Sequence, residues 1–247
     1  MTNIFAQQSE DYAAARPLYP AALFDWIAGH CQARQLAWDC GTGNGQAAAE
    51  LARLFDRVEA TDASPEQVAL AQQAENIRYT AQPAERTSFG PGTFDLVAVA
   101  QALHWFDYRL FWPEVRRVAK PGALFCAWGY AWFRGSDPVE QHLLEPVSDI
   151  VAPYWAAENR LLWDGYQPEA VGFPFQPLSA PDLRIEVDWT VHRIADYVRT
   201  WSAYKRAASD GHQAALDRTI EAAEAQLGPE TRFALHVPLA ILAGIVR

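Results

Sequence analysis

The sequence is short of cysteine, of positive charge and of long apolar runs, and each shortage excludes a class of protein. The three cysteines, Cys31, Cys40 and Cys126, form no C-x-x-C pair, and the six histidines form no H-x-x-x-H pair. Neither a disulfide framework nor a zinc site is indicated. With 20 Lys and Arg against 30 Asp and Glu, the net charge is −10, which argues against a nucleic-acid surface. We therefore expect no metal and no nucleic-acid partner.

Signals for membranes and export are also missing. No apolar run reaches the roughly 18 residues that a membrane-spanning helix needs, and the opening Met1–Phe5 lacks the charged and apolar regions of a signal peptide. We therefore expect a cytoplasmic protein without a membrane partner. The sequence leaves the oligomeric state open.

What the sequence does contain is a regular alternation of strands and helices over its first 130 residues. Strands are predicted at 36–39, 57–61, 76–80, 94–100 and 123–130, with helices near 21–33, 47–54, 64–74 and 108–119. The run Phe94–Ala100 is almost continuously apolar, which is typical of a parallel strand buried on both faces. This order predicts an α/β fold with a doubly wound, mostly parallel sheet.

The alternation stops after residue 130. Residues 131–182 are rich in aromatics and proline and are too long for a plain loop, so we interpret them as a helical lid inserted in the sheet order. The predicted regions are thus 1–130, a cofactor-binding core with an N-terminal cap; 131–182, the lid; and 183–247, strands and helices that complete the core sheet. A strand over 232–246 is expected, with Pro238 marking an edge position or a bulge.

The most informative stretch is the glycine-rich turn after the first predicted strand, Asp39-Cys40-Gly41-Thr42-Gly43-Asn44-Gly45-Gln46. Glycines at alternate positions allow positive φ and a close approach of backbone to ligand. Gln46 stands where the dinucleotide fingerprint G-x-G-x-x-G has its last glycine. Asp39 directly before the turn would repel a pyrophosphate. A cationic nucleoside such as S-adenosylmethionine, with its sulfonium and ammonium groups, fits this turn better.

Further acids follow the next predicted strands. Asp62 lies about twenty residues after the glycine turn, where an acid accepts hydrogen bonds from ribose hydroxyls. Glu85 follows the third strand, and Gln101 and His104 follow the fourth. Because the carboxyl ends of parallel strands meet at one edge of a sheet, these side chains together predict a nucleoside site.

These stretches resemble the successive motifs of class I S-adenosylmethionine-dependent methyltransferases. The matching residues are Asp39–Gly45, Asp62 with Ser64, Ala84 with Glu85, and Ala100–Phe106. More narrowly, three segments resemble the trans-aconitate methyltransferase-like (methyltransferase type 11) group, namely Tyr12-x-x-x-Arg16-Pro17-x-Tyr19-Pro20, Ala100–Phe106 and Thr200–Tyr204. The resemblance covers about residues 1–130 and implies the seven-stranded, Rossmann-like methyltransferase fold. It leaves the lid and the C-terminal half, apart from Thr200–Tyr204, unmatched.

The resemblance also implies a set of cofactor-binding residues. Gly41 and Gly43 would pass beneath the methionine part of S-adenosyl-L-methionine, with Asp39 on its ammonium side and Asp62 holding the ribose. Ala63, Ala84 and Glu85 would contact the adenine. Gln101 would lie near the sulfonium, while Tyr12 and Arg16 would close the pocket, Arg16 as a partner for the methionine carboxylate.

The acceptor is expected to be a small molecule that is methylated on oxygen, with a carboxylate as one case. A carboxylate needs no general base, whereas a hydroxyl or amine does, and His104 is the histidine beside the cofactor strands. His104 is therefore the candidate catalytic residue, as base or as substrate orienter; it could equally be hydrogen-bonded to fix a loop. His104, Trp105 and Tyr130 are the candidate substrate-binding residues. The aromatic lid suggests an acceptor with an apolar portion.

Two other functions fit parts of the sequence. A catalytically silent S-adenosylmethionine-binding regulatory protein would keep the same cofactor residues. An NAD(P)-dependent oxidoreductase fits the α/β pattern and Asp62, but not Asp39 or the missing third glycine of the fingerprint.

Overall fold

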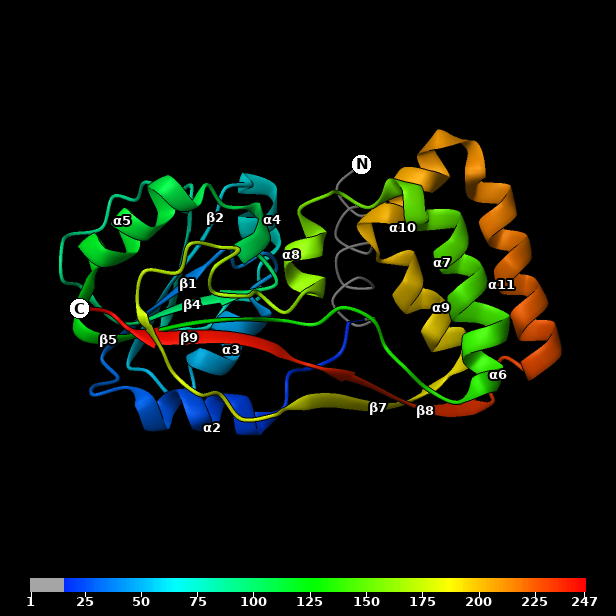
Figure 1. Cartoon of the computed structure of the whole chain (residues 1–247), viewed down its shortest axis with the longest axis horizontal. Coiled ribbons are helices and arrows are strands. Elements are labelled where there is room, and N and C mark those ends of the chain that lie inside the picture. The colour runs from blue at the N-terminus through cyan, green and yellow to red at the C-terminus, as the bar shows by residue number, and fades with distance from the viewer. Residues whose placement is uncertain (1–15) are drawn as a thin grey trace. The chain divides into compact units, whose positions relative to one another are not determined.

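The computed structural model describes residues 16–247, which fall into two units, each assembled from distant parts of the sequence. The first, here called the sheet unit, comprises Pro20–Tyr130, Arg160–Leu183 and Leu239–Arg247. The second, here called the helical unit, comprises, among the described residues, Arg16–Tyr19 together with Ala131–Asn159 and Arg184–Pro238. Figure 1 shows the elements of both.

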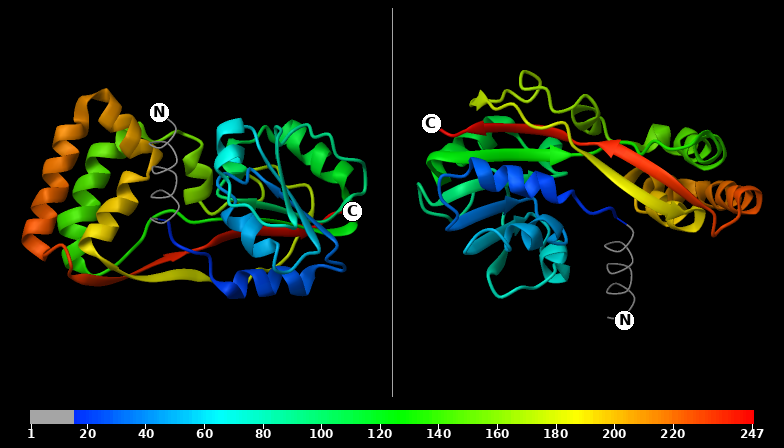
Figure 2. Two further views of the ribbon diagram at one scale, coloured as in Figure 1. Left: turned by 180° about the vertical axis from the view of Figure 1, so that it is seen from behind. Right: turned by 90° about the horizontal axis from the view of Figure 1, so that it is seen from below.

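Five parallel strands form the centre of the sheet unit. They are β1 (Leu36–Cys40), β2 (Arg57–Asp62), β3 (Ile77–Ala81), β4 (Phe94–Ala100) and β5 (Ala119–Gly129). The order across the sheet is β3-β2-β1-β4-β5-β9-β6. The antiparallel β9 (Ala240–Ile245) lies beside β5 (Figure 2), and the two-residue β6 (Gln176–Pro177) follows it. The predicted α/β fold with a seven-stranded, mostly parallel sheet is confirmed.

Helices cover both faces of this sheet, as its buried strands require. The helices of the unit are α2 (Ala21–His30), α3 (Gln46–Leu51), α4 (Pro65–Leu70), the short η1 (Leu103–Trp105), α5 (Tyr108–Val118) and α8 (Asn159–Trp163), whose first residue belongs to the helical unit. Figure 1 shows α2 and α3 on one side of the strands and α5 on the other. Phe24 of α2 meets Trp128 edge-on at 6.0 Å, and Trp112 of α5 meets Phe125 edge-on at 5.1 Å. Side chains of β5 therefore anchor a helix on each face.

The helical unit pairs a β-ribbon with short helices. Its elements are α6 (Asp137–Val139), η2 (Glu140–Leu144), α7 (Glu145–Val151), η3 (Ala152–Tyr154), β7 (Arg184–Thr190), α9 (Val191–Arg199), α10 (Ser202–Ala207), η4 (Ala208–His212), α11 (Gln213–Leu227) and β8 (Arg232–Pro238). β7 and β8 pair antiparallel in a sheet of their own. Along both, buried and more exposed residues largely alternate, as expected of a ribbon with one solvated face.

This division differs from the three consecutive regions predicted from the sequence. The region 183–247 does not complete the core sheet as a block, because the half-exposed β7 and β8 pair with each other and Leu239–Arg247 alone returns to the sheet unit. The expected terminal strand is accordingly two strands, β8 ending at Pro238 and β9 beginning at Ala240, with Leu239 between them.

The predicted lid is likewise shared between the units. Ala131–Asn159 belongs to the helical unit and Arg160–Leu183 to the sheet unit. The second part packs on the sheet through aromatic contacts: Trp112 Nε1 donates to the Val171 carbonyl at 2.8 Å, and the Phe173 ring lies 5.7 Å from that of Phe125. Apolar burial against α5 and β5, which periodicity within 131–182 does not reveal, explains why this half joins the sheet unit.

Candidate functional site

The residues singled out from the sequence gather at the carboxyl edge of the sheet. β1 and β2 run in register, with Cys40 opposite Thr61, and β2 pairs with β3 so that Asp62 lies opposite Ala81. The glycine turn, the segment containing Glu85 and the segment beginning at Gln101 all leave the strands at this edge, where ligands of open α/β sheets bind.

The glycine turn is a left-handed backbone fastened to the sheet. Gly41, Gly43 and Gly45 have φ of 72°, 56° and 84°. The N–H groups of Gly41 and Thr42 both donate to the Thr61 carbonyl, at 2.8 and 2.9 Å. A Cβ at Gly41 would lie 2.6 Å from the Ala102 Cβ, whereas a Cβ at Gly43 would meet nothing within 4 Å. Gly41 is thus needed for close packing, while the space beside Gly43 is open to a ligand.

Asp39 is a buried acid with one oxygen to spare. Its side chain is fully buried, and Oδ2 accepts a hydrogen bond from the Thr42 hydroxyl at 2.6 Å. Oδ1 is buried and makes no hydrogen bond of normal geometry with any described residue. Burial raises the pKa of Asp39 from 3.8 to about 6, partly offset by the hydrogen bonds from Thr42 and the Ala48 backbone. A cationic N–H donor fits such an oxygen, because it satisfies the buried acceptor and balances its charge.

Asp62 ties the glycine turn to the end of β2. Its Oδ2 accepts from the Gly43 N–H and its Oδ1 from the Ser64 N–H, both at 2.9 Å. Each carboxylate oxygen retains further acceptor capacity, so hydroxyl groups can bind it as well. Ala63, which follows, is exposed, and Ser64 caps α4 by accepting from the Gln67 N–H at 3.2 Å. The chain here holds a fixed carboxylate with an uncrowded neighbour.

Ala84 and Glu85 close this edge at the third strand. Ala84 is buried, and Glu85 is part-buried with Oε1 accepting from the Asp107 N–H at 3.0 Å. That hydrogen bond joins the segment after β3 to the start of α5. The buried acceptor of Asp39, the fixed carboxylate of Asp62 and the open space beside Gly43 fit S-adenosylmethionine.

Gln101, at the end of β4, has its side-chain amide bound to the next strand. Its Nε2 donates to the Tyr130 carbonyl at 3.2 Å, and its Oε1 accepts from the Tyr130 N–H at 3.3 Å. Its φ is 57°, which is unusual for a residue other than glycine. In the structure Gln101 therefore fixes the backbone of Tyr130, which is buried. That the Gln101 side chain lies near the cofactor sulfonium stays a prediction.

His104 is buried and bonded to a residue that sequence reasoning did not select. It is 4% exposed, and its Nδ1 lies 2.8 Å from the hydroxyl oxygen of Tyr166, which is 1% exposed. Trp105 beside it is 48% exposed, with its ring 4.7 Å from that of His104. Tyr166 is 62 residues from His104 along the chain. The only local signal was the preceding Gly165, which indicates a turn and not a contact.

Two further predicted cofactor residues come from the start of the sequence. Tyr12 falls outside the described residues. Arg16 belongs to the helical unit, where its charge, after burial, contributes to lowering the pKa of Lys205. Both assignments stay predictions.

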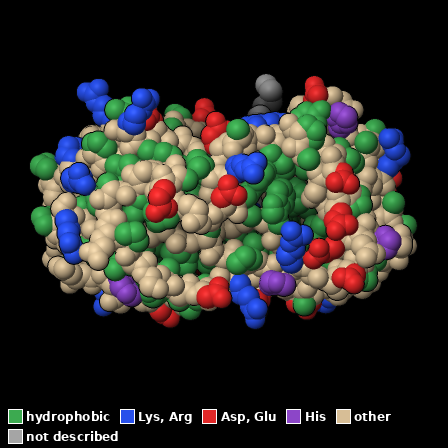
Figure 3. Space-filling model, viewed as in Figure 1, with side chains coloured by type: hydrophobic (Ala, Val, Ile, Leu, Met, Phe, Trp, Pro, Cys, Tyr) green, Lys and Arg blue, Asp and Glu red, His purple; other side chains and the backbone are tan. Residues whose placement is uncertain are grey.

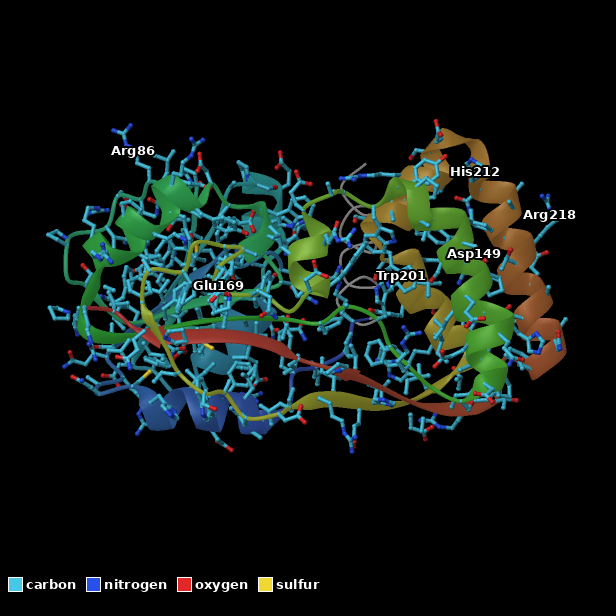
Figure 4. All side chains as sticks on the ribbon, viewed as in Figure 1. Arg86, Asp149, Glu169, Trp201, His212 and Arg218 are labelled. Atoms are coloured by element: carbon cyan, nitrogen blue, oxygen red, sulfur yellow. The ribbon has the colours of Figure 1, made fainter. Side chains whose placement is uncertain are left out.

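The Thr200–Tyr204 stretch builds an aromatic cluster in the helical unit. Trp201, between α9 and α10 (Figure 4), is buried, with its ring 5.3 Å from Trp132, 5.8 Å from Tyr197 and 5.9 Å from Trp155.

On the face that Figure 3 shows, Lys and Arg side chains are scattered among acidic ones. Within residues 16–247 no helix is long and apolar enough to cross a membrane, and no His, Cys, Asp and Glu side chains group as metal ligands.

Comparison with known proteins assigns the family. A family model described as a methyltransferase domain matches residues 38–127. The solved structure of an Anaeromyxobacter dehalogenans protein, provisionally assigned as a type II methyltransferase, is 38% identical, covers 94% of this chain and 98% of its own, and has a TM-score of 0.83.

Curated sequences agree. An uncharacterised methyltransferase of Mycobacterium tuberculosis is 30% identical over 178 residues, which are 67% of this chain and 72% of the relative. A provisionally assigned methyltransferase of Dictyostelium discoideum is 29% identical over 224 residues, 88% of this chain and 83% of the relative. The oxidoreductase alternative is thereby excluded. Since relatives match along most of the chain and the family model spans β1 to β5, this protein belongs to the class I S-adenosylmethionine-dependent methyltransferases.

Proposed function

We propose that the protein transfers the methyl group of S-adenosylmethionine to an oxygen of a small organic molecule, and that carboxylates are the acceptor class. In this proposal Asp39 takes the ammonium group at its buried Oδ1 and Asp62 takes the ribose hydroxyls. Ala63, Ala84 and Glu85 contact the adenine, and Gly41 and Gly43 pass beneath the methionine part, with open space beside Gly43. Arg16 and Tyr12 close the pocket. His104, Trp105 and Tyr130 contact the acceptor.

The chemistry that this asks of the chain is modest. The cofactor, when bound, supplies a methyl carbon activated by its sulfonium. The protein's residues then have to align the acceptor oxygen with that carbon and exclude water. A carboxylate is already nucleophilic as its anion, so no side chain has to remove a proton. The exposed indole of Trp105 offers an apolar surface to the rest of the acceptor.

One observation carries the proposal: a buried, protonatable acid and a fixed carboxylate stand beside an open glycine turn, with a buried histidine after the next strand. The first three features suit a cationic nucleoside. His104 supports an oxygen acceptor, because an imidazole can hydrogen-bond an oxygen whether or not it also takes a proton.

Isotope labelling tests the proposal. The protein is incubated with trideuteromethyl cofactor and a panel of small acids, phenols and amines, alongside a crude metabolite extract, and products are identified by mass spectrometry. We expect a labelled product that loses its label on alkaline hydrolysis, as a methyl ester does and an ether or N-methyl group does not. A hydrolysis-resistant label would overturn the carboxylate assignment. No labelled product, with cofactor binding intact by calorimetry, would overturn small-molecule methylation.

A further inference from the structure

Two residues with strained backbone each hold a residue that we propose to contact the acceptor. Among residues 16–247, Gln101 and Tyr166 are the residues other than glycine with positive φ, at 57° and 51°. L-residues rarely adopt this backbone, and it persists where the surroundings demand it. Each of the two holds a neighbour: Gln101 binds the backbone of Tyr130, and Tyr166 binds the ring of His104.

The environment of Tyr166 decides the direction of its hydrogen bond. Burial raises the pKa of its phenol far above the usual range, so the hydroxyl keeps its proton, while the backbone N–H of His104 also faces the phenol oxygen. The oxygen thus has a donor on one side. Its own O–H needs an acceptor, and within the described part of the chain His104 Nδ1, 2.8 Å away, is in reach.

We infer that Tyr166 is a positioning residue that holds His104 as the tautomer with its proton on Nε2. The ring then acts toward the acceptor as a hydrogen-bond donor and not as a general base. The opposite arrangement, with Nδ1–H donating to the phenol oxygen, would leave a buried O–H without an acceptor among the described groups. The two rings are nearly parallel, with an interplanar angle of 25° and centroids 6.1 Å apart, so the contact also fixes the orientation of the imidazole.

The catalytic consequence rests on the proposed function, and it favours one acceptor class within it. A donor at Nε2 binds a carboxylate oxygen and leaves it nucleophilic, whereas a neutral hydroxyl or amine would still need a base. The Tyr166–His104 pair therefore makes the site selective for acceptors with an anionic oxygen. It draws one partner from Arg160–Leu183 and the other from η1, both parts of the sheet unit.

Nitrogen NMR of protein labelled at histidine tests the inference without depending on activity. The Nδ1 and Nε2 shifts report directly which nitrogen carries the proton, and the His104→Asn variant assigns the signals. We expect the Nε2–H tautomer in the unmodified protein and a mixture of tautomers in Tyr166→Phe. In that variant kcat/KM for the carboxylate acceptor should fall about tenfold, as on loss of one buried hydrogen bond, with cofactor affinity unchanged.

Tyr108→Phe is the matched control. The Tyr108 hydroxyl is buried and has no hydrogen-bond partner among the described residues. Its removal should leave the His104 signals unchanged. A proton on Nδ1 in the unmodified protein would overturn the inference even if Tyr166→Phe fails to fold, and so would an unaltered tautomer in Tyr166→Phe. A third outcome separates the two proposals. If the unmodified protein has the Nε2–H tautomer and Tyr166→Phe has a mixture of tautomers, the tautomer assignment holds. If no acceptor is methylated as well, the proposed function fails.

Discussion

The two halves of the carboxyl edge are built in different ways. Beside β1 and β2 the site is formed mainly by backbone groups. Three glycines with positive φ form the turn, and Asp62 accepts hydrogen bonds from two backbone N–H groups. At β4 and β5 side chains bind one another or a neighbouring backbone, as Tyr166 binds His104 and Gln101 binds Tyr130. A site formed by backbone groups is suited to a ligand that is the same in every relative. A site formed by side-chain pairs can be changed by single substitutions, which suits a ligand that differs between relatives. We therefore propose that the first half binds the cofactor and that the second half selects the acceptor.

The largest expected effect is on the cofactor half. Gly41→Ala should lower the free energy of unfolding by about 2–4 kcal/mol, because left-handed backbone strains an L-residue and the new Cβ meets Ala102 at 2.6 Å. Gly43→Ala should cost about 1–2 kcal/mol from backbone strain alone, since its Cβ enters open space, yet it should weaken cofactor binding. Thermal denaturation and calorimetry measure both. Equal destabilisation by the two variants would contradict the difference in packing.

Substitutions in the acceptor half should lower kcat more than they lower cofactor affinity. His104→Ala is expected to reduce kcat about 10²-fold, within the range for loss of a residue that acts on the reacting group, with little change in cofactor affinity. His104→Gln, which places an N–H donor near the Nε2 position, should retain more activity than His104→Asn. Single-turnover kinetics and calorimetry separate the two effects. A loss of cofactor affinity larger than the loss of turnover would move His104 into the cofactor half.

Asp62→Ala tests the fixed carboxylate. Cofactor binding should weaken by roughly 1–3 kcal/mol, since ribose hydroxyls lose their acceptor and the Gly43 N–H of the turn loses the carboxylate to which it donates. Ser64→Ala is the control: it removes the cap of α4 at a cost of about 1 kcal/mol in stability but keeps the backbone N–H that Asp62 binds. Calorimetry should find its cofactor affinity close to that of the unmodified protein. Unchanged affinity in Asp62→Ala would remove the ribose assignment.

The smallest expected effect is a pH dependence of binding at Asp39. Its pKa in the folded protein is raised from 3.8 to about 6, so the free protein loses stability as pH rises from about 4 to 6, where the folded state holds the extra proton. A cofactor ammonium needs the ionised carboxylate. The cofactor dissociation constant should therefore rise as pH falls below about 6, by up to about tenfold per pH unit. Calorimetry from pH 5 to 8 measures this, and Asp39→Asn should give a flat profile with weaker binding.

Local sequence patterns predicted the sheet well. Phe94–Ala100 is a strand over the predicted residues, because a continuous apolar run bounded by turns leaves little choice, and Tyr108–Val118 is one residue shorter than expected. Asp39, Asp62 and Gln101 come to one edge because parallel strands share a direction. Their roles toward cofactor and acceptor stay predictions.

Contacts distant in sequence explain what could not be predicted. Nothing near Tyr166 indicates that its hydroxyl meets His104, and nothing near Val171 indicates that its carbonyl accepts from the Trp112 indole. The same limit applies to the division of 131–182 between units. Aromatic density in that stretch indicates burial, but not which surface provides it.

The sheet unit is not one stretch of chain, and this affects the order in which it can form. During synthesis β1 to β5 emerge first, all elements of the helical unit follow, and β9 comes after β8. The edge of β5 that later pairs with β9 therefore has no strand partner for its backbone groups until the helical unit has been translated. A nascent chain halted before residue 239 exposes that edge to other chains, so we expect such ribosome-bound intermediates to aggregate more readily than the finished chain.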